Sequence, residues 1–284
     1  MIGYADLHLH TTASDGSMTP PELVAYAKAK GLSVISVTDH DTVSGLALAM
    51  ASADGIRVIP GVEFSSLYDG EGEPFRLHIL GYGIDPEAPE IISAVEAGQT
   101  VRRRKHSLRL EYLKERFGID LTEEDARQGS AMVGKISLAH LLIEGGYADT
   151  VQDAIGKFMS APDFPEGRIP HSLAISAITA SGGIPVYAHP LGGEGEEHLS
   201  KNEAERRIKL LADAGIRGAE CYYSRYSRAE VSALVDISER LGLLVSGGSD
   251  FHGMNKTVII RTLVSDGGEV TADKLTVLGE LFEG

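Results

Sequence analysis

Seven short apolar runs, each bounded by turn residues, constrain the fold of this chain more than any other feature. They occupy residues 3–9, 32–38, 56–66, 76–83, 183–189, 218–223 and 243–248. Their lengths and β-branched content are typical of buried strands. Helical segments lie between several of them, at 19–31, 202–215 and 227–242. This alternation predicts an α/β fold with a parallel sheet, either open or closed into a barrel.

The clearest helical segment is TPPELVAYAKAKG, residues 19–31. Thr19 suits the N-cap, Pro20 suits the first helical position, and Glu22 completes a capping box. Gly31 is expected to end the helix. A last apolar run, TVIIRTLV at 257–264, is interpreted as an extra strand outside the barrel.

Residues from about 88 to 172 break the alternation. PEIISAVEAGQTVRRRKHSLRLEYLKERFG reads as one long helix, and TEEDARQ, SLAHLLIEGG and TVQDAIGKFM read as short helices. No strand is expected in this stretch. We therefore predict a barrel domain formed by residues 1–90 and 173–284, with a helical subdomain inserted at 91–172.

Charge and composition exclude several classes of protein. The 284 residues carry 26 Lys and Arg against 41 Asp and Glu, a formal net charge of −15, which disfavours generic nucleic-acid binding. Cys221 is the only cysteine, so an internal disulfide and a cysteine-rich zinc site are excluded. No run approaches the roughly 20 apolar residues of a membrane span, and the N-terminus lacks signal-peptide features. A cytoplasmic location is expected.

Imidazoles and carboxylates recur at or near the ends of these predicted strands. They are His8, His10, Asp39, His40, Asp41, Glu63, His78, His189, Asp250 and His252. In a parallel barrel the C-terminal strand ends share one face, so residues from the whole chain would meet there. Two histidines in H-x-H on a strand point to the same side and can bind one ion. Histidine with carboxylate and no thiolate suits Zn, Mn or Fe better than Ca or Mg.

A single strand-end histidine is more often a hydrogen-bonded structural residue than a ligand. We interpret the histidines that fall in predicted helices or loops in that way: His106, His140, His171 and His198. The joint pattern at the strand ends differs, because buried charged groups are costly unless they are paired or bound to metal. It therefore favours a metal site.

These motifs resemble the PHP family, named for polymerase and histidinol phosphatase. The matching segments are DLHLHTTASDG, SVTDHDT, IPGVEFS, HILGYG, YAHP and GGSDFHG, in order from residue 6 to 253. The resemblance implies a distorted (β/α)7 TIM-like barrel with an inserted helical subdomain. It also implies a site of two to three divalent ions, Mn, Fe or Zn, at the C-terminal face.

The family's ligands carry over onto nine positions of this chain. His8, His10, Glu63 and Asp250 would bind a first metal, and Glu63 would bridge to a second held by His78 and His189. Asp15, His40 and His252 would hold a third. We predict catalytic roles for Glu63, Asp250 and His252, with His252, His40 or a metal-bound water as the candidate proton donor to the leaving group. Asp39 and Asp41 flank His40 and suit either a ligand-orienting role or a helix-capping or solvated role.

The predicted insertion also resembles that of PHP members acting on nucleoside 3′,5′-bisphosphates or on RNA 5′ ends. Those members usually read GRPH where this chain reads GKIS, so Lys135 replaces arginine and Ser137 replaces histidine. Lysine attracts phosphate only as a point charge. We predict substrate binding by Lys135, Arg168, His171 and Arg225. The run RRRK at 102–105 suits either a solvated helix face or a nucleic-acid backbone.

The expected activity is metal-dependent hydrolysis of a small sugar or nucleotide phosphate ester, including a cyclic diester followed by its monoester. The alternative is a nucleoside 3′,5′-bisphosphate 3′-phosphatase or an RNA 5′-end exonuclease. A non-catalytic metal-stabilised module and a C–N amidohydrolase are the rivals from other classes. The expected partner is a small phosphorylated substrate, with no membrane and no stable nucleic-acid partner, and the oligomeric state is left open.

Overall fold

The computed structural model describes residues 3–122, 125, 134–159 and 168–283. The strands in these ranges are β1 (Tyr4–Leu9), β2 (Leu32–Val37), β3 (Arg57–Tyr68), β4 (Phe75–Tyr82), β5 (Ile169–Pro170), β6 (Ile184–Tyr187), β7 (Gly218–Tyr223) and β8 (Leu244–Gly248). The seven predicted strands are thus all present, with boundaries shifted by a few residues.

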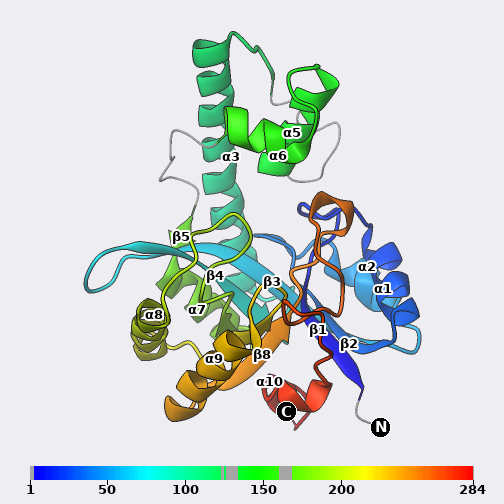
Figure 1. Ribbon diagram of the computed structural model, residues 1–284, viewed down its shortest axis with the longest axis vertical. Helices are drawn as coiled ribbons and strands as arrows, with labels where there is room; N and C mark the ends of the chain where they lie inside the picture. Colours follow the sequence, from blue (N-terminus) through cyan, green and yellow to red (C-terminus); the bar gives the residue numbers. More distant parts are fainter. Residues whose placement is uncertain (1–2, 123–124, 126–133, 160–167, 284) are drawn as a thin grey trace.

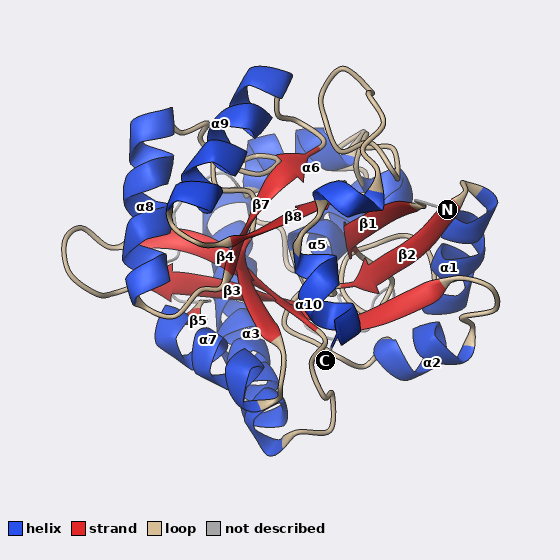
Figure 2. Ribbon diagram, turned by 90° about the horizontal axis from the view of Figure 1, so that it is seen from below, coloured by secondary structure: helices blue, strands red, loops and turns tan. Residues whose placement is uncertain are grey.

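The sheet runs β1-β2-β3-β4-β6-β7-β8, and the short β5 pairs with β3 outside this path. Backbone hydrogen bonds of 3.0 Å from His10 N to Phe251 O and from Asp250 N to His8 O join β1 to the segment that follows β8. The sheet therefore bends round on itself into a nearly closed barrel (Figure 2), which confirms the predicted α/β barrel class.

The prediction of a parallel sheet is wrong for one strand. β4 pairs antiparallel with both β3 and β6. The reason is the connection: only residues 69–74 separate β3 from β4, and a link that short makes a hairpin, because a parallel crossover needs a dozen or more residues.

Two smaller expectations are also corrected. Residues 169–170 form a strand, β5, where none was expected, paired in parallel with Ser66 and Leu67 of β3. The run 257–264 forms no strand. Ile260 and Leu263 bury their side chains in the core without a ladder, and the backbone N–H of Arg261 donates to the buried Asp6 carboxylate at 2.8 Å.

The helices cover the outside of the barrel and form the upper part of the molecule (Figure 1). They are α1 (Pro20–Ala29), α2 (Leu46–Ala51), α3 (Pro89–Phe117), α5 (Lys135–Glu144), α6 (Val151–Phe158), α7 (His171–Ala180), α8 (Lys201–Asp213), α9 (Arg228–Arg240) and α10 (Val277–Glu283). The capping box of Thr19 and Glu22 at α1 is present as predicted. The predicted helix at TEEDARQ lies almost entirely outside the described residues. No described helix is both long and apolar enough to span a membrane.

The barrel interior is packed with side chains. Leu7, Val34, Ile59 and Leu80 from four strands form one buried cluster, to which α10 contributes Val277 and Leu278. A larger cluster lies between the sheet and its surrounding helices. Because the interior is filled, the surface available for a site is at the strand ends and the loops beyond them.

Helix α3 joins two hydrophobic cores. Near its start, Ile91, Ala94 and Val95 pack into the large barrel cluster. Near its end, Leu110 and Leu113 belong to a separate cluster with residues of α5 and α6. Figure 1 shows α3 rising from the sheet, with α5 and α6 packed beside its upper half. This long helix therefore connects the barrel rigidly to the helices above it.

Candidate metal centre

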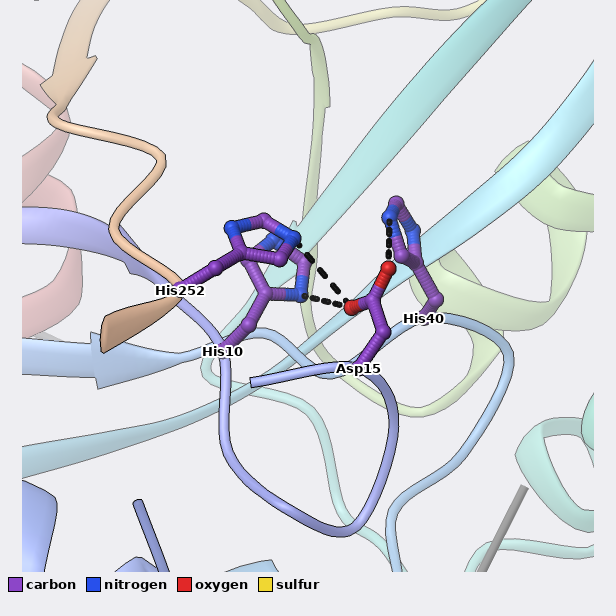
Figure 3. Close-up of side chains that lie close together, drawn as sticks. All are labelled: His10, Asp15, His40 and His252. Carbon is purple, nitrogen blue, oxygen red and sulfur yellow. Dashed lines mark ion pairs between the residues drawn. The ribbon is translucent and has the colours of Figure 1, made fainter. Parts of the chain in front are cut away.

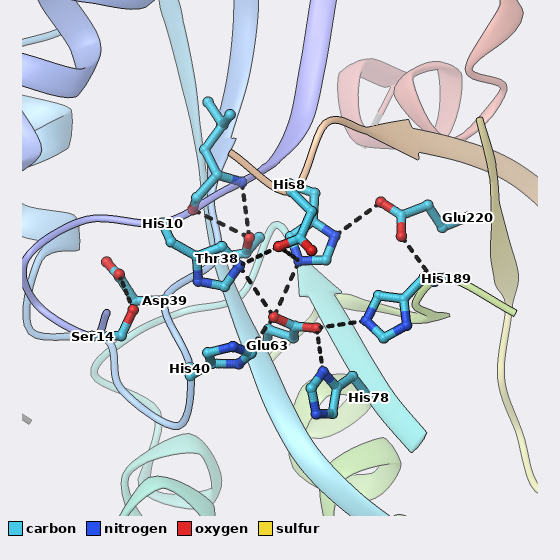
Figure 4. A network of polar contacts seen from close by, with 12 residues as sticks. His8, His10, Ser14, Thr38, Asp39, His40, Glu63, His78, His189 and Glu220 are labelled. Carbon is cyan, nitrogen blue, oxygen red and sulfur yellow. Dashed lines mark hydrogen bonds and ion pairs between the residues drawn. The ribbon is translucent and has the colours of Figure 1, made fainter. Parts of the chain in front are cut away.

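Strand β1 delivers two imidazoles to the same place. His8 and His10 are two residues apart, so they share one side of the strand, and both are fully buried. Their Nε2 atoms lie 3.1 and 3.2 Å from Glu63 Oε2 of β3. Asp250, directly after β8, places Oδ1 3.7 and 3.4 Å from the same two nitrogens. The first predicted ligand group is thus brought together, and Figure 4 shows its His8, His10 and Glu63 side by side.

Glu63 lies at the centre of the cluster. Its Oε2 is also 3.0 Å from His40 Nδ1, and its Oε1 is 2.8 Å from His78 Nδ1 and 3.3 Å from His189 Nε2. His78 reaches this position from the middle of β4, where it pairs with Ser65 across the antiparallel ladder. The second predicted group therefore also meets at Glu63, with His40 beside it.

Asp15 lies on the loop after β1 and faces the cluster. Its Oδ1 is 3.2 Å from His252 Nε2 and 3.8 Å from His10 Nδ1, and its Oδ2 is 3.9 Å from His40 Nε2. Figure 3 shows these four side chains pointing toward one another. The third predicted group is therefore brought together as well, with His10 close to both the first and the third.

Asp39 holds the loop that carries Asp15. Its carboxylate accepts hydrogen bonds from Thr11 N at 2.7 Å, Thr11 Oγ1 at 2.6 Å and Ser14 Oγ at 2.5 Å. Asp39 is nearly fully buried. Of the two roles left open for it, orienting a candidate ligand fits these contacts, because the anchored loop fixes where Asp15 points.

The cluster has the features expected of a metal site. Several buried atoms in it make no hydrogen bond within the described residues: His8 Nε2, both ring nitrogens of His10, His40 Nδ1, Glu63 Oε2 and His252 Nε2. Buried polar atoms in proteins are nearly always hydrogen-bonded. A group of unsatisfied imidazole nitrogens and carboxylate oxygens facing one another therefore needs a common binding partner. Three sets are spaced to hold an ion: His10, Asp15, His40 and His252; His8, His10 and Glu63; and His40, Glu63 and His78.

The pKa shifts in the cluster show that its buried carboxylates need positive charge beside them. Burial opposes protonation of His8, but the carboxylates of Glu63, Glu220 and Asp250 outweigh it and hold the pKa of His8 well above its ordinary value. Burial likewise opposes ionisation of Glu63, and the imidazoles around it nevertheless hold its pKa well below the usual range. The buried carboxylates thus require cations nearby, which either protons on histidine or metal ions can provide.

Glu220 of β7 is a site residue that the sequence reasoning missed. Its Oε1 lies 2.9 Å from His8 Nδ1, and its Oε2 accepts a 2.8 Å hydrogen bond from the backbone N–H of His189. A carboxylate on Nδ1 directs the other ring nitrogen of His8 toward Glu63 and fixes the tautomer. The available signal was a lone carboxylate in the apolar run GAECYY, since a buried charge needs a partner.

Asp250 presents one oxygen to the cluster because its other oxygen is held elsewhere. Tyr223 Oη donates to Asp250 Oδ2 at 2.7 Å, and Lys256 Nζ donates to it at 2.8 Å. Asp250 also has a positive φ of 59°, as do His189 at 31° and Asp41 at 51°. Non-glycine residues in this region are strained, and such strain gathers at functional sites.

A cavity of about 910 Å³ adjoins the cluster, and Asp15, His40, His78 and His189 lie in its wall. Seven basic side chains also line it, against three glutamates: Arg76, Arg102, Lys105, Arg109, Lys135, Arg168 and Arg207, and Glu194, Glu196 and Glu197. In a chain of net charge −15, this concentration of positive charge beside the cluster marks a place for an anion.

Two of the four predicted substrate-binding residues line this cavity, Lys135 and Arg168. His171 and Arg225 do not line it. His171 begins α7 and contacts Asp69 at 3.1 Å, and Arg225 is exposed after β7. The sequence could not place them, because it does not show where a loop turns after its strand ends.

The basic run 102–105 is divided by the helix period. Arg102 and Lys105, three residues apart, share a face of α3 and line the cavity, whereas Arg103 and Arg104 are exposed. Ser137 Oγ accepts a 2.8 Å hydrogen bond from Gly134 N at the start of α5. It therefore stabilises the helix end that presents Lys135.

The chain belongs to the PHP family. Residues 6–161 match the family model described as PHP domain. This confirms the resemblance found in the sequence motifs.

Curated relatives match nearly the whole chain. A 3′,5′-nucleoside bisphosphate phosphatase of Chromobacterium violaceum is 30% identical over 260 residues, covering 87% of this chain and 86% of the relative. The 5′-3′ exoribonuclease Rnm of Escherichia coli is 32% identical over 262 residues, covering 87% and 84%. A phosphoribosyl 1,2-cyclic phosphate 1,2-diphosphodiesterase of Eggerthella lenta is 29% identical over 259 residues, covering 87% and 94%.

Solved structures show the same fold. A protein of Bifidobacterium adolescentis assigned as a metal-dependent phosphoesterase superposes with a TM-score of 0.81 at 27% identity, covering 98% of this chain and 95% of the other. A Chromobacterium violaceum protein described as an amidohydrolase, with bound sulfate and no metal, gives a TM-score of 0.80 at 26% identity, covering 99% and 96%.

Proposed function

We propose that this protein is a metal-dependent phosphoesterase acting on small sugar or nucleotide phosphates that carry a second anionic group. One observation carries the proposal: the unsatisfied His and carboxylate cluster opens into a cavity in whose wall seven Arg and Lys side chains outnumber the carboxylates. The family and the names of the relatives support hydrolysis of a phosphate ester. A cytoplasmic location and the lack of a stable nucleic-acid partner remain predictions from sequence.

The nine predicted ligands are proposed to hold up to three divalent ions, Mn, Fe or Zn, with Glu63 shared between the first two. When bound, such ions polarise the phosphoryl group and activate water for in-line attack. The protein's own groups hold this arrangement. His252 donates no spare proton to a leaving group, because its Nδ1 contacts Asp250 O at 2.9 Å and its Nε2 faces Asp15. We therefore assign His252 to metal binding and not to general acid catalysis.

Replacing Asp15 by asparagine is expected to remove one metal ion per chain. The amide keeps the size of the side chain but loses the negative charge that faces His10, His40 and His252. The first two groups, which do not use Asp15, should stay filled. Metal content after gel filtration, measured by mass spectrometry, tests this. An unchanged metal content in Asp15→Asn would contradict the assignment of Asp15 to a third ion.

The basic wall favours a substrate with two charged ends. Lys105 shows how closely the cations of this wall lie together. Its pKa is lowered to about 7 by burial and by the charges of Arg109, Arg168 and Arg76. A bound anion would relieve that repulsion, so a phosphate at this wall would both gain affinity and orient the scissile ester toward the cluster.

The pH dependence of anion binding is expected to depend on Lys105. Lysine is charged below its pKa, so affinity should be higher below pH 7 and should fall as the pH rises through about 7. Sulfate is a suitable probe because it does not titrate in this range. Its inhibition constant, measured between pH 6 and 8.5, should rise several-fold more in the wild type than in Lys105→Gln. A profile that is the same in both proteins would contradict this role for Lys105.

The central experiment measures phosphate release by the manganese-loaded protein from matched substrates. A nucleoside 3′,5′-bisphosphate, the corresponding 3′-monophosphate, a ribose cyclic phosphate with and without a 5′-phosphate, and a short 5′-phosphorylated RNA would be compared by kcat/KM. The second phosphate should raise kcat/KM by about 10- to 100-fold, the range of a hydrogen bond to a charged group.

The outcomes separate the alternatives. Preference for the bisphosphate or for RNA would select the alternative function over the cyclic ester. No release from any ester with Mn, Zn or Fe would overturn phosphoesterase activity. Equal kcat/KM with and without the second phosphate would overturn only the assignment of the basic wall.

A further inference from the structure

Arg102 of α3 forms a buried contact with a residue next to a candidate ligand. Its Nε donates to Asp41 Oδ2 at 3.1 Å, and its Nη2 donates to the same oxygen and, at 3.0 Å, to Ser65 Oγ. Asp41 is 1% exposed, so this is an ion pair largely removed from water. Removing one partner of such a buried ion pair strongly destabilises the folded protein, because the other charge is left buried and unpaired.

Asp41 in turn connects the two chain segments that carry His40 and Glu63. Its backbone N–H donates to Glu63 O at 3.0 Å, and its Oδ1 accepts from Ser65 N at 3.0 Å. Asp41 follows His40 directly and has a positive φ of 51°. Its carboxylate therefore links the end of β2 to the middle of β3 at the point where His40 Nδ1 and Glu63 Oε2 face each other.

Helix α3 is shaped to approach Asp41. A Cβ atom added at Gly98 would lie 3.0–3.2 Å from the Asp41 side chain, which only glycine permits without displacement. Gln99 Nε2 lies 3.5 Å from Asp41 O. Three positions on one face of α3, 98, 99 and 102, thus meet this single residue.

We propose that Arg102 is a positioning residue that sets, through Asp41, the placement of His40 and Glu63 and thereby couples the helical segment to the metal cluster. The inference rests on the proposed function, since it concerns the same cluster. Through α3, the helices that present Lys105 and Lys135 are held at a defined distance from the reacting centre.

The rival reading is that Arg102 binds substrate directly, because it also lines the cavity. The two roles separate in the variant Asp41→Asn, which leaves the Arg102 charge in the cavity but weakens its anchor. A positioning role predicts that Asp41→Asn and Arg102→Gln have similar effects. A substrate-binding role predicts that only Arg102→Gln raises KM.

The test compares Arg102→Gln, Arg102→Lys, Asp41→Asn and the double variant, with Arg103→Gln as the matched control. Arg103 is exposed on the same helix, and its side chain donates to Thr100 Oγ1 at 3.1 Å. Manganese affinity by titration calorimetry, circular dichroism of the metal-free proteins, and the separate kcat and KM values are the readouts.

We expect manganese affinity and kcat to fall about tenfold in Arg102→Gln and in Asp41→Asn, as for other groups that orient metal ligands. The double variant should be no worse than either single one, and Arg102→Lys should recover only part of the loss, because lysine lacks the forked geometry. Unchanged metal affinity, or additive losses in the double variant, would overturn the inference. A wild type that binds no manganese would instead overturn the proposed function.

Discussion

Glu63→Gln is expected to lower kcat/KM for phosphate-ester hydrolysis by about 10³-fold, the upper range for loss of one group that stabilises transition-state charge. The reason is the number of partners that Glu63 serves. Its Oε2 faces His8, His10 and His40, and its Oε1 faces His78 and His189. An amide has one uncharged oxygen and an NH₂ group that cannot bind metal, so one of the two groups that share Glu63 loses its ligand and the other keeps only a neutral one.

The fold should survive this substitution, because glutamine has the shape of glutamate. Far-UV circular dichroism and gel filtration would verify that, and Glu115→Gln, an exposed position on α3, serves as the control. Metal content should fall by at least one ion per chain in Glu63→Gln and stay unchanged in Glu115→Gln. A kcat/KM within tenfold of the wild-type value would contradict the assignment of Glu63 as a ligand shared by two metal ions.

The second large effect is expected at Glu220, which contacts the candidate ligand His8 through its side chain and the candidate ligand His189 through its backbone N–H. Glu220→Gln should weaken metal binding by about 10- to 100-fold, the usual effect of removing a carboxylate behind a metal-bound histidine. The glutamine oxygen can accept only one of the two hydrogen bonds, and its NH₂ group then faces the other donor. Either His8 turns or the strained His189 backbone relaxes.

Thermal unfolding provides a direct measure of this loss. Metal that binds only the folded chain stabilises it, and a 100-fold weaker affinity removes about 2.7 kcal/mol of that stabilisation at a fixed metal concentration. The metal-dependent rise in Tm should therefore shrink in Glu220→Gln and stay at the wild-type value in Glu239→Gln, an exposed position on α9. An undiminished rise in Glu220→Gln would show that His8 needs no orienting carboxylate.

Most of the barrel was predictable because its strands are local features. Each apolar run, from residues 3–9 to 243–248, carries its own length, composition and flanking turn residues. The antiparallel direction of β4 was also readable from the sequence, because the gap between the predicted runs 56–66 and 76–83 is shorter than a parallel crossover. The fate of the run 257–264 was not readable, since a strand needs an available partner edge. Ile260 and Leu263 are buried in the core without one, and Ile259 is exposed.

The candidate site was partly predictable. Histidine and carboxylate at strand ends are visible in a sequence, and His8, His10, His40, His78 and His189 all meet Glu63. The resemblance to the PHP family added Asp15, which faces His10, His40 and His252. Glu220 was not predicted, because the run GAECYY is typical of a buried core strand except for this one carboxylate. Most of the basic wall was missed because Arg76 of β4 is brought beside Lys105 and Arg109 of α3 only by the tertiary fold.

The sequence by itself determined the barrel class, the family and the kinds of atoms available to hold metal, since these depend on local periodicity and on residue types at strand ends. The tertiary structure decided which side chains support them. Only the folded chain brings Glu220 behind His8, Arg102 onto Asp41, and the basic face of α3 above the cluster. The physical reason is that burial and charge pairing act between segments distant in sequence, and no local pattern records those distances.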